Sequence, residues 1–422
     1  MATATIECVR SHLKSYLATK DQLLHWLGER APSRFEPFYS SIDIRDAGFK
    51  LAPVDANLYP AGFNNICSED LEHSTELLKP LLKRHLGFLP KRVAILPELH
   101  TRNHFYVDNL YELRQLFRRI GIETEIGWLP EDTQSSKDPV ELQTTDERKV
   151  LAHPFSRKED KLVFAPFEPE FILLNNDFSS GLPEILKRLS QPIEPSPKMG
   201  WHSRKKSDFF VHYNKLAGEL AEAAGCDAWH VQVTTQLVEG VDFQAHLGMD
   251  RIARAVDATL EQMRSEYAKR NIQEEPFVFV KNNAGTYGMG ILRVQSGKEL
   301  LELNRRERNK MAVGKNQLQV HDVIVQEGIP TRFQLDGVYS EPVIYLLGHD
   351  LLGGFLRKNP SRGKVDNLNS RGMVFQKLCI ADLKHGADRD LELEMVYGTI
   401  AQLSASAISL EIEGVEGLSS RS

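Results

Sequence analysis

A glycine-rich loop between two short apolar segments is the feature that most restricts what this chain can fold into. The apolar segments are residues 277–280 and 291–294, and the loop runs from Lys281 to Gly290. Its glycines are Gly285, Gly288 and Gly290. Because glycine has no Cβ, the backbone N–H groups of such a loop can approach phosphate oxygens, and a neighbouring lysine adds positive charge. The stretch therefore predicts a strand–loop–strand hairpin that closes over a nucleotide.

The order of the glycines excludes two better-known phosphate loops. A Walker A loop needs Gly-Lys-Ser/Thr, which is absent here, and the dinucleotide fingerprint G-x-G-x-x-G leads into a helix. In this chain the order is G-x-x-G-x-G, and a strand-like segment follows it. An ordinary glycine-rich hairpin turn is the alternative when the loop is considered alone.

A second motif lies about forty residues further on. Residues 323–325 form a short apolar run that predicts a buried strand. Four residues follow it directly: Gln326, Glu327, Gly328 and Ile329. A strand end with free backbone N–H and C=O groups can hydrogen-bond the edge of an adenine. The alternative is a core strand with a polar end.

A third motif combines arginines with oxygen-bearing side chains. Residues 342–347 and 351–356 predict a hairpin, and Arg357 follows it directly. The loop after the hairpin holds further polar residues: Asp366, Asn367, Asn369 and Arg371. Carboxylate and amide oxygens suit magnesium, and arginines neutralise a phosphoryl group in transfer. A polar turn with scattered salt bridges is the alternative.

The hydrophobic pattern predicts an α/β protein. In the N-terminal half, strand-like segments at 93–96 and 171–174 alternate with helical patterns at 68–86 and 110–119, which favours a mostly parallel sheet. The C-terminal half is predicted to be α+β, with a strand at 229–234 among its elements. We expect residues 131–160 to form an irregular excursion.

The proline-rich segment at residues 191–200 is the predicted domain boundary. We expect an N-terminal α/β substrate domain over residues 1–195 and a nucleotide-binding catalytic domain over 196–412. The last residues, 413–422, are predicted to be a disordered tail.

Composition restricts the class of partner. A net charge of −6 and a pI of about 6.2 give no electrostatic basis for binding nucleic acid. No stretch resembles a membrane span or a signal peptide. Four widely separated cysteines, Cys8, Cys67, Cys226 and Cys379, are typical of free thiols in a reducing compartment. We therefore expect a cytoplasmic protein, with self-association into a homo-oligomer left open.

Taken in order, these three motifs resemble an ATP-grasp domain, and they are also similar to a bacterial family of glutamate–cysteine ligases. The resemblance continues into the N-terminal half through VDANLYPAGFNN, PELHTRN, LNNDFSSG and GWHSRKKS. It therefore covers most of residues 40–375, and it implies an N-terminal α/β domain followed by an ATP-grasp domain.

The resemblance implies roles for individual residues. Lys281, the loop glycines and residues 326–329 would contact ATP, together with a second lysine that is Lys205 or Lys206, with Lys206 our candidate. The first Mg²⁺ ligand would be Glu341 or Asp336. The second would come from Asp366, Asn367 or Asn369, although the usual Glu-x-Asn pattern is missing there.

The implied reaction is the first step of glutathione biosynthesis. ATP would phosphorylate the γ-carboxylate of glutamate, and the amine of cysteine would attack the acyl phosphate to give γ-glutamylcysteine, ADP and phosphate. The candidate catalytic cations are Lys281, Arg357 and Arg371. A ligase for another amino acid or peptide, or a non-catalytic nucleotide-binding regulator, is the alternative function.

Glutamate binding needs arginines and at least one acid. The N-terminal half offers such groups at predicted strand ends, where α/β proteins form ligand sites. The candidates are Arg45, Asp55, Asn57, Glu98, Arg102 and Asn103. Ordinary turn and surface positions are the alternative for each of them.

Overall fold

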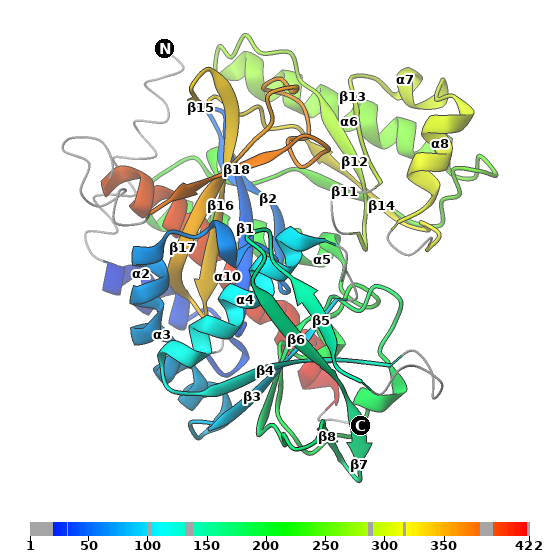
Figure 1. Ribbon diagram of the computed structural model, residues 1–422. Coiled ribbons are helices and arrows are strands. Elements are labelled where there is room, and N and C mark those ends of the chain that lie inside the picture. Colours follow the sequence, from blue (N-terminus) through cyan, green and yellow to red (C-terminus); the bar gives the residue numbers. More distant parts are fainter. Residues whose placement is uncertain are drawn as a thin grey trace.

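Strands from both ends of the chain meet in one sheet of a mixed α/β fold (Figure 1). The computed structural model describes residues 20–31, 33–98, 103–130, 138–285, 290–314, 318–379 and 391–419. Apolar residues between positions 6 and 17 recur three and four residues apart and predict a further helix, but this segment lies outside the described ranges. Within the described ranges, no helix combines the length and the apolar character needed to cross a membrane.

The sheet that joins the two ends, here called the central sheet, has the strand order β18-β17-β16-β1-β2, and β15 pairs with β16. All its neighbouring strands are antiparallel. Its strands are β1 (Tyr39–Asp46), β2 (Leu51–Asn57), β15 (Gln334–Leu335), β16 (Val338–Leu347), β17 (Asp350–Lys358) and β18 (Val374–Leu378). Ile42 lies opposite Ile344, so residues 302 positions apart in the sequence are direct neighbours.

Each face of the central sheet has its own apolar core. Ile42 and Ile344 point to a core shared with α5 (Lys206–Ala223), α10 (Leu391–Ser419) and α2 (Lys20–Gly28). Val343, Tyr345 and Phe355 point to the opposite face, against α3 (Ser68–Leu86) and α4 (His104–Arg119). Because successive side chains of a strand alternate between faces, residues 341, 343 and 345 share this second face.

A second sheet confirms the predicted parallel arrangement. Its order is β10-β9-β3-β4-β6-β5, and every pair is parallel except β5 with β6. Its strands are β3 (Arg92–Pro97), β4 (Glu123–Trp128), β5 (Val140–Gln143), β6 (Lys149–Pro154), β9 (Phe171–Asn175) and β10 (Ile193–Glu194). The irregular excursion expected at 131–160 is wrong for β5 and β6, which bury alternate side chains at one edge of the sheet.

A third sheet, here called the flap sheet, carries the glycine-rich segment. Its order is β11-β14-β12-β13, and all its pairs are antiparallel. Its strands are β11 (Thr235–Val238), β12 (Val278–Asn282), β13 (Ile291–Val294) and β14 (Val323–Glu327). The helix α6 (Met249–Lys269) packs on it, and α7 (Gly297–Leu301) and α8 (Arg305–Ala312) complete this lobe, at the upper right of Figure 1. Strand β12 extends through Lys281, which was predicted to begin the loop.

Three smaller corrections concern the C-terminal half. The strand expected at 229–234 is a 3-10 turn at Ala228–His230, because the Asp227 side chain accepts the N–H of Trp229, and β11 starts only at Thr235. The helix α10 continues to Ser419, so residues 413–419 are helical rather than a disordered tail. Division of the chain after residue 195 stays a prediction, and strands from both sides of that point pair in the central sheet.

The remaining elements are short. The hairpin β7 (Ser156–Lys158) and β8 (Lys161–Val163) stands beside the parallel sheet. The 3-10 turns are Ser33–Phe35, Phe63–Asn65, Glu184–Leu186, Pro197–Met199 and Ala228–His230.

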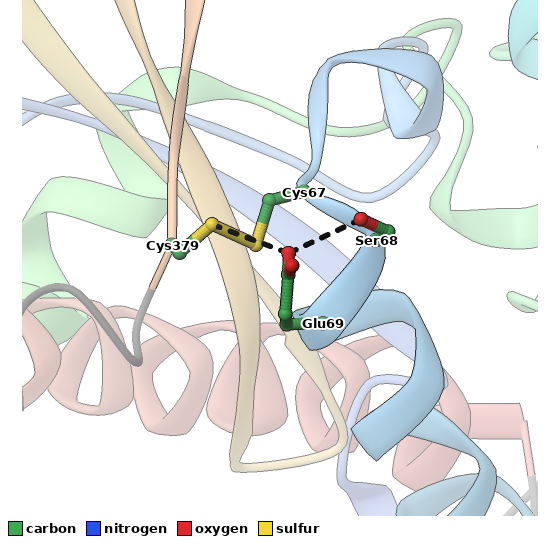
Figure 2. Close-up of a disulfide and its surroundings, with 4 residues drawn as sticks. All are labelled: Cys67, Ser68, Glu69 and Cys379. Atoms are coloured by element: carbon green, nitrogen blue, oxygen red, sulfur yellow. Dashed lines mark hydrogen bonds between the residues drawn. A yellow bond between two sulfur atoms is a disulfide. The ribbon is translucent and has the colours of Figure 1, made fainter.

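The prediction that all four cysteines are free thiols is wrong for two of them. Cys67 and Cys379 form a disulfide with Cα atoms 5.5 Å apart (Figure 2). Cys226 is not part of a disulfide, and Cys8 lies outside the described residues.

Candidate active site

A pocket between the central sheet and the flap sheet gathers most of the predicted site residues. The flap sheet contributes residues from β12 and β13, and the central sheet contributes residues from β1, β2, β16 and β17. The lining residues are Asp43, Arg45, Val54, Asp55, Lys206, Phe279, Lys281, Asn282, Gly285, Ile291, Glu341, Arg357, Asn367 and Asn369. The pocket thus holds four cationic side chains and three carboxylates, contributed by both halves of the chain.

Strand alternation explains why the charged side chains of the central sheet lie together. Arg357 lies opposite Glu341 in the ladder, and Phe355 lies opposite Val343, on the face that packs against α3 and α4. Asp43 lies opposite Val343 on that same face. One end of this face is therefore apolar core, and the other end is the charged floor of the pocket.

Arg357 is held by two buried carboxylates. Its Nη1 donates to Asp43 Oδ2 at 2.7 Å and to Glu341 Oε1 at 2.9 Å, and its Nη2 donates to Asp43 Oδ1 at 3.3 Å. Burial opposes the guanidinium charge, but Asp43 and Glu341 outweigh it and raise the pKa of Arg357. Its Nε is buried without a hydrogen-bond partner. The guanidinium is therefore charged and fixed in place.

The two acids respond differently to this arrangement. Burial raises the pKa of Asp43 despite the attraction of Arg357. Burial also acts on Glu341, but Arg45 and Arg357 together outweigh it and lower the pKa of Glu341. Glu341 thus ionises more readily than an ordinary glutamate, and Asp43 ionises less readily than an ordinary aspartate.

Arg45 connects the floor of the pocket to two other segments. Its Nε donates to Glu341 Oε2 at 2.8 Å, its Nη1 to the carbonyl of Ile329 at 3.2 Å, and its Nη2 to the carbonyl of Asp366 at 2.5 Å. All three nitrogens thus have partners within the protein. Arg45 therefore positions the end of β14 and the polar loop after β17.

Two lysines approach the pocket from the other side. Lys281 Nζ lies 2.5 Å from Gln326 Oε1 and 2.9 Å from the carbonyl of Val54. Burial lowers the pKa of Lys281 to about 8. Lys206 forms an ion pair with Asp55. Burial alone would raise the pKa of Asp55, but Lys206 and Lys281 outweigh it and lower that pKa.

The start of the glycine-rich loop is fixed to the N-terminus of α5. The carbonyl of Asn283 accepts the N–H of Lys206 at 2.8 Å, and its Oδ1 accepts the N–H of Ser207 at 2.9 Å. Gly285 lines the pocket, Gly290 lines an adjoining pocket described below, and Gly288 lies outside the described residues. The loop is therefore anchored at its base beside Lys206.

Several polar groups at the end of β14 already have hydrogen-bond or ion-pair partners within the protein. The N–H of Glu327 donates to the carbonyl of Thr234, and the N–H of Gly328 donates to that of Phe277. The Glu327 side chain is a buried partner of Lys50, with Nζ and Oε1 2.5 Å apart. The expectation of free N–H groups at this strand end is wrong for these two residues. Contact of residues 326–329 with an adenine stays a prediction.

The predicted metal ligands only partly converge. Glu341, Asn367 and Asn369 line the pocket, and their oxygens match the preference of magnesium. However, each oxygen of Glu341 already accepts a hydrogen bond from an arginine. Asp366 faces the adjoining pocket, and its Oδ2 accepts the N–H of Gly363 at 2.9 Å. The Oδ1 of Asn367 accepts the N–H of Asn369 at 3.0 Å. The donor set therefore fits magnesium with Asn369 as the least engaged side chain of these described residues.

Two further pockets extend the site. One shares Phe279, Ile291, Asn367 and Asn369 with the first pocket and adds four cations, Arg293, Lys310, Arg362 and Arg371. The other shares Asn282 and Gly285 and is lined by Trp201, His202, Lys205, His321 and Asp322, among others. Lys205 and Lys206 thus belong to different pockets, and only Lys206 reaches the charged floor.

The predicted glutamate-binding residues separate into two groups. Arg45 and Asp55 line the pocket. Asn57 ends β2, and Asn103 is the exposed N-cap of α4. Glu98 accepts the N–H of Asp177 at 3.0 Å, and the carbonyl of Asp177 in turn accepts the N–H of Trp201 at 2.8 Å. Arg102 lies outside the described residues.

Sequence reasoning missed three lining residues that matter for the chemistry: Asp43, Phe279 and Asn282. Asp43 lies in the alternating segment SSIDIRD, whose polar positions 43 and 45 share a face. The alternation could have identified that face, but nothing local shows that its partner is Arg357, 314 residues away.

Comparison with known proteins decides the family. The model of the family described as "Glutamate-cysteine ligase" matches residues 14–412. The chain belongs to the glutamate–cysteine ligase family. It is therefore an ATP-dependent ligase enzyme, and its family acts in glutathione biosynthesis.

A solved structure supports the same assignment. The "Putative gamma-glutamylcysteine synthetase" from Methylobacillus flagellatus KT is 35% identical, covers 98% of this chain and 97% of its own, and superposes with a TM-score of 0.87. A glutathione synthetase-like effector from Globodera pallida, at 11% identity and a TM-score of 0.38, covers 84% of this chain and 77% of its own. No curated protein matches the chain. The fold of this ligase is therefore that of the Methylobacillus protein.

Proposed function

We propose that this ligase joins L-glutamate to L-cysteine and forms γ-glutamylcysteine in the pocket between the central and flap sheets. The observation that carries the proposal is the convergence of Arg357, Lys281 and Lys206 on one pocket in a chain of this family. We further propose that the two facing sheets form an ATP-grasp arrangement, with the nucleotide between them. We expect the enzyme to work in the cytoplasm, where ATP and amino acids are supplied.

The first half-reaction transfers the γ-phosphoryl group of ATP to the γ-carboxylate of glutamate, giving an acyl phosphate and ADP. Such a transfer depends mainly on positioning and on neutralising charge over the phosphoryl oxygens. Lys281 and Lys206 would hold the phosphates from the flap side, and Arg357 would face them from the floor. The carboxylates around Arg357 keep that guanidinium in one orientation, which limits reorganisation during the reaction.

Magnesium fits this site through amide and carboxylate oxygens. Asn367 and Asn369 would hold the ion, with Glu341 beside them. When bound, magnesium would supply positive charge that offsets the negative charge of the phosphates during transfer.

In the second half-reaction the amine of cysteine attacks the acyl carbon. The C–N bond forms, the C–O bond to phosphate breaks, and one proton is released. Negative charge develops on the carbonyl oxygen, and cations held in fixed positions would stabilise it. In this proposal, Arg357 and Lys281, which both line the pocket, would take that role.

Release of ADP tests the proposal. The purified full chain should release ADP in the presence of magnesium only when glutamate and cysteine are both added. Aspartate in place of glutamate, or alanine in place of cysteine, serves as the control substrate. Equal turnover with other amino acids would support a different carboxylate–amine ligase, and absence of turnover with any pair would contradict the proposal.

A further inference from the structure

One of the two pockets that extend the site is lined by histidines. Here called the histidine pocket, it has a lining that includes Trp201, His202, Lys205, His321 and Asp322. Asn282 and Gly285 line both this pocket and the pocket between the central and flap sheets, here called the charged pocket. The two spaces therefore meet at the base of the glycine-rich loop. The volume of the histidine pocket, about 280 Å³, gives room for a free amino acid.

A backbone carbonyl fixes the protonation pattern of His202. The Nδ1 atom of His202 lies 3.1 Å from the carbonyl oxygen of Phe178. Because a carbonyl oxygen can only accept a hydrogen bond, Nδ1 carries the proton, and in the neutral ring Nε2 keeps its lone pair. His202 is an exposed residue, and its Nε2 has no hydrogen-bond or ion-pair partner among the described residues. The neutral imidazole can therefore accept a proton at Nε2.

The segment that supplies this carbonyl is itself held in place. Phe178 has a φ of 45°, in the left-handed region that few residues other than glycine adopt. The preceding residue, Asp177, donates its N–H to Glu98 Oε1 at 3.0 Å, and its carbonyl accepts the N–H of Trp201 at 2.8 Å. Strained backbone persists where surrounding contacts determine it, and such positions gather at functional sites. These contacts therefore keep the Phe178 carbonyl beside His202.

Gly200 leaves the space that this arrangement needs. A Cβ atom at position 200 would lie 2.8 Å from the carbonyl oxygen of Asp177 and 2.8 Å from Nδ1 of His202. Both distances are too short for non-bonded atoms, so a larger residue would displace the ring or the carbonyl. The close approach of these two groups therefore requires glycine at this position.

Two charged side chains also line the histidine pocket. Lys205 Nζ lies 3.8 Å from Asp322 Oδ2, and both side chains are partly exposed. Asp322 Oδ1 also accepts the N–H of Gly240 at 3.1 Å. A long ion pair between partly exposed groups is weak, so Lys205 can bind the carboxylate of a ligand instead. The pocket thus offers a cation for a carboxylate and a lone pair for an ammonium group, which are the two charged groups of a free amino acid.

We propose that the histidine pocket binds the amino acid that supplies the amine, and that His202 is the base that accepts the amine proton. This assignment rests on the proposed function and deepens it, because it gives a place to the second substrate and to its proton. Lys205 holds the carboxylate of the amino acid, and His202 Nε2 faces its ammonium group. The acyl phosphate forms in the charged pocket, and the amine reaches it past Asn282 and Gly285.

The proton transfers and the bond changes balance. An ammonium nitrogen has no lone pair, so it must lose a proton before it can attack the acyl carbon. His202 Nε2 accepts that proton, the C–N bond forms, and the C–O bond to phosphate breaks. The departing phosphate carries away the second proton of the amine, and the imidazolium gives its proton to water.

Hydroxylamine as a substitute nucleophile separates the two half-reactions. It is a weak base that is largely unprotonated at neutral pH, so it attacks an acyl phosphate without a base from the enzyme. With the purified full chain, ATP, magnesium, glutamate and saturating hydroxylamine, His202→Gln should form glutamyl hydroxamate within about twofold of the wild-type rate, while kcat with cysteine should fall by about 10²-fold or more. The iron(III) complex of the hydroxamate measures the first reaction, and ADP release measures the second.

Four further variants exclude other causes. His202→Ala should recover part of its turnover with cysteine when imidazole is added, because the added base replaces the missing side chain. His321→Gln should lose less turnover than His202→Gln, because no hydrogen bond to another described residue fixes the His321 ring. Lys205→Met should raise the KM for cysteine by about two- to fivefold and leave the KM for ATP unchanged. His25→Gln changes a side chain on α2 that is 81% exposed, and it should behave as wild type.

Three outcomes would overturn the assignment of His202 as the base. Equal losses of hydroxamate formation and cysteine turnover in His202→Gln would show a structural role. Unchanged cysteine turnover in that variant, or a larger loss in His321→Gln, would show that another group accepts the proton. A rise in the KM for ATP in Lys205→Met would assign Lys205 to the nucleotide and overturn its role in binding the amino acid. A wild-type enzyme that forms no hydroxamate would contradict the ligase reaction itself, so the two failures are recognised separately.

Discussion

Replacing Arg357 by methionine is expected to lower the free energy of unfolding by about 3–5 kcal/mol, because removing one partner of a buried ion pair leaves uncompensated charge. Asp43 would lose the partner that donates to both its oxygens, and Glu341 would keep only Arg45. Chemical denaturation followed by circular dichroism measures this difference. The variant should also lose most of its ligase activity, since the fixed cation of the floor is gone.

Two further variants test whether the lost ion pair is the cause of the lower stability of Arg357→Met. Arg305→Met removes an exposed arginine at the start of α8 and should change stability by less than about 0.5 kcal/mol. Asp43→Asn combined with Arg357→Met should recover part of the lost stability, because the unpaired acid is removed with its partner. An Arg357→Met protein as stable as wild type would show that the buried network does not stabilise the central sheet.

Replacing Lys281 by methionine is expected to reduce kcat/KM by about 10²–10³-fold, the usual effect of removing one group that stabilises transition-state charge. Methionine keeps the length of the side chain and removes the cation that faces Gln326 and Val54. Steady-state ADP release measures the effect. Lys298→Met changes an exposed lysine on α7 and should leave kcat/KM unchanged.

The pH dependence shows whether the charge of Lys281 is what matters. Burial lowers its pKa to about 8, so the free enzyme holds the cation below that pH and loses it above. Because kcat/KM reports ionisation of the free enzyme, wild-type kcat/KM should fall as pH rises through about 8. Lys281→Arg should be less active at neutral pH, and its profile should lack that fall. An identical fall in both proteins would assign it to another group.

Local sequence patterns predicted much of the fold. The apolar periodicity at 68–86 and 110–119 located α3 and α4, and the alternating order predicted the parallel sheet. The hairpin at 342–356 was also located, because its strands are apolar and its turn contains Gly348. Lys281, Gly285 and Arg357 were each selected from a local sequence motif. In the structure, all three line one pocket.

Contacts between segments that are far apart in the sequence could not be predicted. The partnership of Asp43 with Arg357 follows from the order β17-β16-β1, which joins segments about three hundred residues apart. The disulfide follows from the position of β18 beside the start of α3. The edge strand β5 and its neighbour β6 were missed because most of their residues are exposed or half-buried, so their sequences resemble a polar loop.

The most direct test is a crystal structure of the full chain with magnesium and a non-hydrolysable ATP analogue. The triphosphate should lie between the central and flap sheets, with Lys281 and Lys206 on one side and Arg357 on the other. Magnesium should contact Asn367 or Asn369. A nucleotide bound elsewhere, with this pocket filled only by solvent, would contradict the account.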